Sequence, residues 1–255
     1  MNQLPHIQST TAMFPGLPFI PALERISKEV KNRPELHMDW VQLCPQSFGC
    51  VTDDLLYTLK DTYPKTKFQL HSNVRIVHGK KPVHGSSSGA WVEMYLQEFS
   101  RLTQVTGCGI YSIHSGYEDE MLLEDMFENV RRMNTKYNMT IAIEGLYPER
   151  RRKALVSSWR QYHQLLDADI PYAIDLSHLN IVARAEGHSM YLVQELLSSH
   201  NCIEVHLSSN NGLWDSHLPL SKEGKEWWWD FLEYCHPQTT IFSEENLQKR
   251  KIGQI

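Results

Sequence analysis

Short runs of apolar and β-branched residues recur along the chain, most of them about thirty residues apart, the length that a β-α-β unit needs. Segments with apolar residues at helical spacing lie between them, at 90–102, 122–133 and 190–197. Strands and helices that alternate eight times predict an α/β fold, a single (β/α)8 TIM barrel, in one domain spanning residues 1–255. The expected strands are His6–Ser9, which is the weakest, Trp40–Leu43, Lys67–His71, Gly109–His114, Thr140–Glu144, Tyr172–Asp175, Cys202–His206 and Thr239–Glu244.

The segment from Glu226 to Tyr234 is apolar all round and contains Trp227, Trp228 and Trp229. Tryptophans of this kind can stack on a substrate, but large aromatic side chains more often fill a core. We therefore expect a helix buried against the barrel.

Composition narrows the function classes. The chain has 255 residues, close to the usual size of one TIM barrel. Its net charge of −5 provides no global basic field for nucleic acid.

No apolar run is long enough to cross a membrane, and no signal peptide is evident. Five scattered cysteines without a CxxC pair indicate reduced thiols in a cytoplasmic protein. Thirteen histidines exceed what packing requires.

Most of the predicted strands end in a residue that can bind a metal, and three more such residues follow in the loops. In a barrel of parallel strands these ends gather at the C-terminal face, where active sites lie. Buried carboxylates repel one another unless cations neutralise them, and imidazoles among them favour zinc, iron or manganese. The sequence therefore predicts a metal site from His71, His114, Glu144, Asp175, His178, His206, Asp215, His217 and Glu244. Glu245 is expected to point outward, because alternation places Phe242 and Glu244 on the same face.

Weaker candidates lie in the loops. Asn73 and Arg75 follow His71 closely and could face the substrate. Arg150, in the charged run 149–153, could clamp an anion, although a solvated helix start explains that run equally well. The segment 85–89, flanked by Lys80, Lys81 and His84, could be either a mobile lid or a plain flexible loop.

In order and spacing these residues resemble the xylose isomerase-like superfamily of TIM barrels over nearly the whole chain, and the ligand order resembles that of endonuclease IV. The resemblance implies a first metal on His71, His114 and Glu144. It implies that Glu144 bridges to a second metal, which is completed by Asp175, His206 and Glu244. A third metal would be held by His178, Asp215 and His217. Simple sugar isomerases of the superfamily keep mainly the second set, so the nine residues together favour a trinuclear centre.

Three chemistries of that superfamily use such residues: phosphodiester hydrolysis at abasic DNA, oxygen activation by multinuclear non-haem iron, and isomerisation or epimerisation of a sugar. Val74 stands where endonuclease IV has an aromatic residue, and the stretch 205–217 is shorter than in that nuclease. The His-Leu-Ser start and Asp-Ser-His end of this stretch are more similar to the oxygenases. Against them, the chain is short and has no glycine-rich opening. The Asp-Ser-His-Leu-Pro-Leu string that ends at Leu220 is similar to sugar isomerase-like members.

We therefore expect an iron-dependent oxygenase-type enzyme that acts on a peptide or small biosynthetic substrate, which a partner protein could deliver. An endonuclease IV-like phosphodiesterase and a sugar isomerase or epimerase are the alternatives. Two to three divalent ions are expected, iron in preference to zinc or manganese, with nucleic acid a less favoured partner and no membrane. The residues expected to carry the chemistry are Glu144, Asp175, His206 and Glu244.

Overall fold

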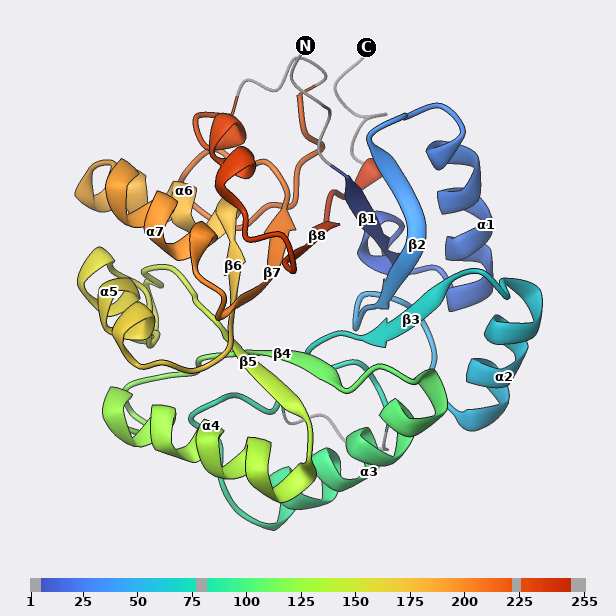
Figure 1. The fold of residues 1–255 in the computed structure, drawn as a ribbon, viewed down its shortest axis with the longest axis horizontal. Helices are drawn as coiled ribbons and strands as arrows, with labels where there is room; N and C mark the ends of the chain where they lie inside the picture. Colours follow the sequence, from blue (N-terminus) through green and yellow to red (C-terminus); the bar gives the residue numbers. More distant parts are fainter. Residues whose placement is uncertain (1–5, 77–81, 222–225, 249–255) are drawn as a thin grey trace.

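The computed structural model describes residues 6–76, 82–221 and 226–248, and its strands form one eight-stranded sheet that curls into a barrel (Figure 1). All the pairings are parallel, in the order β3-β2-β1-β8-β7-β6-β5-β4. The predicted (β/α)8 TIM barrel is confirmed. The strands are β1 (Ile7–Thr10), β2 (Leu36–Leu43), β3 (Lys67–Leu70), β4 (Ile110–His114), β5 (Thr140–Glu144), β6 (Tyr172–Asp175), β7 (Cys202–Leu207) and β8 (Thr240–Ser243).

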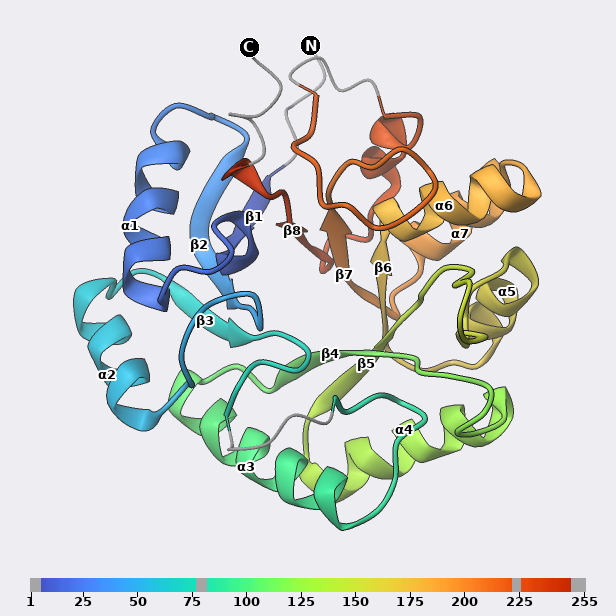
Figure 2. The same ribbon diagram turned by 180° about the vertical axis from the view of Figure 1, so that it is seen from behind.

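Helices surround the barrel, as the view from behind also shows (Figure 2). Their apolar faces are buried against it. Capping residues set the ends of these helices. The Thr52 hydroxyl accepts a hydrogen bond from the Leu55 amide at the start of α2, and α3 ends at Gly107, which has a left-handed backbone conformation. The α-helices are α1 (Phe19–Val30), α2 (Asp53–Thr62), α3 (Ala90–Thr106), α4 (Leu123–Tyr137), α5 (Trp159–Asp167), α6 (Leu176–Glu186) and α7 (Met190–Ser198). Two short 3-10 helices, η1 (Thr11–Met13) and η2 (Trp229–Tyr234), complete the described elements.

The tryptophan segment differs in detail from its prediction. A 3-10 helix, η2, replaces the expected α-helix over 226–234, and residues 226–228 form a bend and turn before it. Trp228 is fully buried, and Trp227 and Trp229 pack against the core from the edge. The expected packing role is therefore confirmed for the described residues.

The barrel has one seam without a ladder, between β3 and β4. No strand pairing joins these two strands, although both lie within the described residues. The segment that follows β3 along the chain covers part of the seam, because the Gly85 and Ser86 amides donate to the carbonyls of His114 and Ser115. The Asn129 side chain also donates to the Gly85 carbonyl.

The segment 85–89 was expected to be either a lid or a flexible loop. The structure instead shows its first residues buried and hydrogen-bonded at the barrel seam. Lys80 and Lys81, which were predicted to flank it, lie outside the described residues.

All five cysteines are free, as the sequence predicts. None of the helices in the described ranges is long and apolar enough to cross a lipid bilayer.

Candidate metal centre

The nine side chains predicted from the sequence lie together at the C-terminal ends of the strands. They come from β4–β7 and from the segments that follow β3, β6, β7 and β8. Most of them are buried, whereas His114, Asp215 and His217 are partly exposed. Eight of the nine line one cavity, and His206 lies beneath it, fully buried and next to Glu144 and Glu244.

The centre of the group is built around two glutamates. His206 Nδ1 lies 3.6 Å from Glu144 Oε1 and 3.7 Å from Glu244 Oε1. On the outer side, His71 Nε2 approaches Glu244 Oε1 at 2.8 Å, and His114 Nε2 lies 3.7 Å from Glu144 Oε2. Four groups of potential ligand atoms within 4.8 Å of one another share these residues: Cys44–His71–Glu244, His71–Glu144–His206, Glu144–Asp175–His178 and Asp175–His206–Glu244.

Glu204, which sequence reasoning missed, orients His206. Its carboxylate lies 3.1 Å from His206 Nε2 and accepts hydrogen bonds from the side-chain amides of Gln42 and Gln69. A carboxylate on Nε2 holds the proton there and leaves the Nδ1 lone pair facing Glu144 and Glu244, as in the carboxylate–histidine pairs of metal sites. The available signal was spacing, because Glu204 lies two residues before His206 and so shares its inward face of β7.

A second cluster lies beside the first. His178 Nδ1 donates to the Gly145 carbonyl at 2.8 Å, which turns Nε2 toward the Oδ2 atoms of Asp175 and Asp215, 3.5 and 3.6 Å away. His217 Nε2 lies 2.8 Å from the same Asp215 oxygen. Asp175 caps α6, because its Oδ1 accepts from the Ser177 and His178 amides, and its other oxygen remains free for the site.

The charges of the site depend on one another. Burial opposes ionisation of Glu244, but His206 and His71 outweigh it and hold its pKa at about 2. Burial likewise opposes the charge on His178, yet Asp175 and Asp215 raise its pKa to about 10. His114 behaves in the opposite way, since burial lowers its pKa to about 4. In the metal-free protein, protons on histidine therefore balance the buried carboxylates.

Three buried polar atoms at this site have no hydrogen-bond partner among the described residues, namely Glu144 Oε2, His206 Nδ1 and His217 Nδ1, and the buried atoms His71 Nε2 and Glu244 Oε1 face only each other at 2.8 Å. A buried polar atom without a partner is costly, and native proteins rarely leave several of them together. Imidazole nitrogens and carboxylate oxygens around a common space are ligands for divalent zinc, manganese or iron. The residues present therefore fit a metal ion, and their chemistry does not single out iron.

The cavity above the cluster encloses about 210 Å³. Its wall includes three residues that sequence reasoning missed, Tyr117, Tyr147 and Glu149. The two tyrosines each follow a strand-end ligand, His114 or Glu144, by three residues, and this shared position was the available signal. No lysine or arginine is among the described residues that line the cavity.

The three candidate substrate residues have different positions. Asn73 lines the cavity, and its side-chain oxygen accepts from the Val83 amide at 2.6 Å. Arg75 and Arg150 are exposed and are not among the described lining residues. In the run 149–153, Arg152 forms ion pairs with Asp119 and Glu120 and lies over the Tyr117 ring.

Glu245 lies outside the cluster, but it does not face solvent. It is fully buried, and its carboxylate accepts from Arg33 at 2.7 Å and from the Leu220 amide. The expected outward direction is therefore correct only relative to the barrel interior, since an internal ion pair covers this side chain.

No protein-family model and no curated protein matches the chain. Among solved structures, it is similar to a D-tagatose 3-epimerase-like protein, with a TM-score of 0.65 and 16% identity over 97% of this chain and 95% of the other. An AP endonuclease, family 2, from Brucella melitensis gives a TM-score of 0.62 with 15% identity over 95% of this chain and 93% of the other. The IOLI protein with a binding zinc atom gives 0.63 with 9% identity over 97% and 91%.

At such low identity, these similarities establish the fold alone, a TIM barrel that this chain shares with the three structures. The three structures are described as epimerase-like, endonuclease and zinc-binding proteins. They give no support to the iron-oxygenase interpretation favoured by the sequence, whereas both of its alternatives are represented among them.

Proposed function

We propose that this protein is a metal-dependent epimerase or isomerase of a small polyhydroxylated carbonyl compound, such as a ketose. The observation that carries the proposal is the pair Glu144 and Glu244. Glu144 Oε2 is buried without a hydrogen-bond partner among the described residues, and Glu244 Oε1 is buried against His71 Nε2 at 2.8 Å. Both glutamates line a small cavity that no described lysine or arginine enters.

The wall chemistry favours a neutral substrate. Tyr117 and Tyr147 bring hydroxyl groups that match sugar hydroxyls. The Asn73 side chain also lines the wall, where it is held by hydrogen bonds to Ser72 and to the Val83 amide. A cavity of about 210 Å³ is small compared with the pockets of drug-sized ligands. No lysine or arginine is present in the described wall to pair with the charge of an anionic substrate, and the histidine charges are already balanced by the buried carboxylates.

Epimerisation next to a carbonyl group needs a base on one side of a carbon atom and an acid on the other. We assign these tasks to Glu144 and Glu244: one carboxylate takes the proton from the carbon, the bonding electrons move to the carbonyl oxygen, and a carboxyl group returns a proton to the carbon. Glu144, Asp175, His206 and Glu244 would hold a divalent ion, which when bound polarises the substrate carbonyl. Glu204 keeps His206 in the tautomer that this requires.

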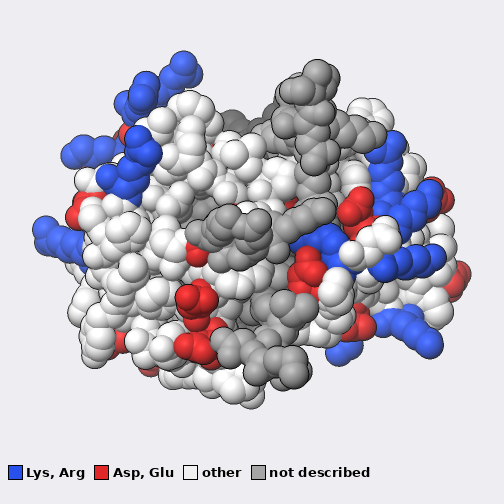
Figure 3. Space-filling model, turned by 90° about the horizontal axis from the view of Figure 1, so that it is seen from above, with Lys and Arg blue, Asp and Glu red and all other residues white. Residues whose placement is uncertain are grey.

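A second candidate is a metal-dependent phosphodiesterase, and the additional cluster His178–Asp215–His217 favours it. Hydrolases of phosphodiesters use two or more neighbouring ions to clamp the attacking and leaving oxygens. Against it, binding of nucleic acid depends on basic side chains. No described lysine or arginine lines the cavity. On the side of the barrel seen in Figure 3, lysines and arginines stand at the two flanks.

Solvent isotope exchange distinguishes the two. The protein, loaded in turn with manganese, zinc and cobalt, is incubated in D₂O with a panel of ketoses and followed by NMR. We expect deuterium at the carbon next to the carbonyl group of one sugar, together with its epimer or isomer. Cleavage of an abasic-site duplex or of a simple phosphodiester, without exchange into any sugar, would replace this proposal by the hydrolase.

Two neighbouring glutamates supply a matched pair of variants. Glu244→Gln removes a proposed proton acceptor and should lower exchange by about 10²–10⁴-fold. Glu245→Gln changes an equally buried carboxylate that faces Arg33 and not the cavity, so its exchange rate should stay near that of the wild type. Equal losses in both variants would count against the assignment of Glu244.

A further inference from the structure

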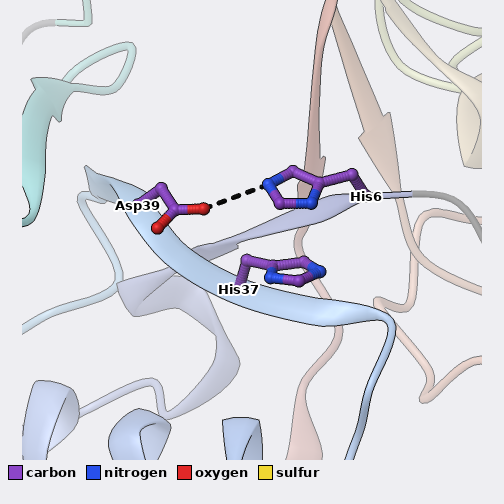
Figure 4. A group of neighbouring side chains, drawn as sticks. All are labelled: His6, His37 and Asp39. Atoms are coloured by element: carbon purple, nitrogen blue, oxygen red, sulfur yellow. Dashed lines mark hydrogen bonds and ion pairs between the residues drawn. The ribbon is translucent and has the colours of Figure 1, made fainter.

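Two histidines and an aspartate lie together at the end of the barrel opposite to the candidate metal centre. His6 immediately precedes β1, and His37 and Asp39 lie near the start of β2 (Figure 4). Because all the strands run parallel, these residues occupy the N-terminal end of the barrel. The candidate metal centre uses none of them.

Strand geometry explains why they meet. His37 and Asp39 are two residues apart in β2, so they point to the same face of the sheet. The ladder pairs Gln8 with His37, which brings His6 alongside them, and the register then shifts so that Ser9 pairs with Val41. The Gln8 side chain supports this bulge by accepting a hydrogen bond from the Trp40 amide at 2.9 Å. The three side chains are thus held by two strands and a supported bulge.

The contacts of the three side chains are close. His6 Nε2 lies 3.1 Å from Asp39 Oδ2, and the His6 and His37 rings stack with centroids 3.6 Å apart and an angle of 20° between their planes. One ligand atom of each residue lies within 4.8 Å of those of the other two. Figure 4 shows the three side chains on one side of the strands.

The three residue types are those that bind zinc, so their chemistry indicates a metal site and not only a hydrogen-bonded pair. Two imidazoles and one carboxylate form the protein ligand set of open zinc sites, in which water completes the coordination. Zinc–nitrogen bonds of about 2.0–2.1 Å require neighbouring ligand atoms about 3.3 Å apart. The side chains of His6 and Asp39 are 59% and 68% exposed, and His37 is half-buried, so His6 and Asp39 have room to rotate toward His37.

We propose that His6, His37 and Asp39 form a second site for a divalent transition-metal ion, with zinc the expected ion and nickel or copper as competitors of the same ligand preference. The bound ion ties the start of β1 to β2. At this face of a TIM barrel side chains contribute to stability, whereas catalysis is carried out at the other end. The site is independent of the proposed function.

The test uses zinc alone as the probe. The wild type and His37→Ala are equilibrated with zinc, freed from excess metal and compared by elemental analysis. Crystals of both are then examined for anomalous scattering at the zinc edge. We expect one zinc fewer per chain in the variant, and a peak between His6 and Asp39 in the wild type only. No peak there, or equal zinc counts, would overturn the proposal.

His163 provides the matched control. It is an exposed histidine that lies 3.0 Å from Asp167, and it belongs to no group of three possible ligands in the described part of the chain. His163→Ala should keep the zinc content of the wild type. Zinc should also raise the midpoint of thermal unfolding less in His37→Ala than in the wild type or His163→Ala, because only His37→Ala has lost the tie between β1 and β2. An equal rise in all three proteins would contradict that tie.

Discussion

Asp175 uses its two carboxylate oxygens for different purposes. One accepts the amides that begin α6, and the other faces the cluster. Asp175→Asn keeps the cap, since asparagine caps a helix as well as aspartate does, but it removes the charge. We expect a folded protein that has lost most of its metal, as elemental analysis and a thermal melt will show. Full metal content would exclude Asp175 as a ligand.

Glu204 acts through His206. Glu204→Gln removes the charge that fixes the proton on His206 Nε2, so metal affinity measured by competition with a chelator should fall about 10–100-fold. Glu245→Gln is again the control, since it changes a buried carboxylate without touching the cluster. Unchanged affinity in Glu204→Gln would show that packing alone orients His206.

The strand-end positions could be read from the sequence because parallel strands bring their ends to one face. Glu204 could not be assigned from its residue type alone, since its role depends on Gln42 and Gln69 arriving from two other strands. The group His6–His37–Asp39 was also not predicted from the sequence, because its geometry depends on a register shift between β1 and β2. No periodicity encodes such a shift.

At the level of elements, the end of β5 is set by a close approach to α5. A Cβ on Gly145 would overlap the ring of Tyr162, whose hydroxyl donates to the Leu146 carbonyl. Gly145→Ala should therefore cost about 1–3 kcal/mol of unfolding free energy, measured with denaturant. It should also weaken metal binding, because the Gly145 carbonyl holds His178.

Gly109, which directly precedes β4, is the control for that variant, since nothing lies within 4 Å of its added Cβ. Gly109→Ala should be near neutral in stability and in metal binding. If both alanine variants behaved alike, overlap with Tyr162 would not be the cause.

Pattern reasoning placed the regular elements well and the connecting segments less well. Apolar residues that alternate, or that recur at helical spacing, mark the buried face of a strand or an α-helix. Such buried faces recur in every β-α unit of the barrel. The segment around Trp228 is short and apolar all round, so spacing did not distinguish an α-helix from the 3-10 helix found. The segment 85–89 has the composition of a loop, and its role at the seam depends on carbonyls of β4.

For the whole molecule, pH should act through the protons held by the cluster. Asp175 and Asp215 raise the pKa of His178 to about 10, and Asp215 raises that of His217 to about 9, in both cases against the effect of burial. These folded values exceed the unfolded value of about 6.5. The metal-free protein should therefore lose unfolding free energy as pH rises from about 7 to 10.

Metal binding should reverse this dependence. An ion held by His178 and His217 displaces their protons, so affinity should increase with pH over the same range. Calorimetry in buffers of different ionisation enthalpy will measure the protons released, and melts at several pH values with and without metal will measure the stability. A metal-free melt that does not change between pH 7 and 10 would contradict the charge balance.

The seam between β3 and β4 gives the metal a further consequence. His71 directly follows β3 and His114 ends β4, so an ion shared by these histidines and Glu144 would join two edges that no backbone ladder connects. Without metal, the barrel should open first along this line, and amides on both sides should exchange with deuterated water faster than those of β6 and β7. Metal coordination would then substitute for the strand pairing that β3 and β4 lack, so that full closure of the barrel would depend on the bound ion.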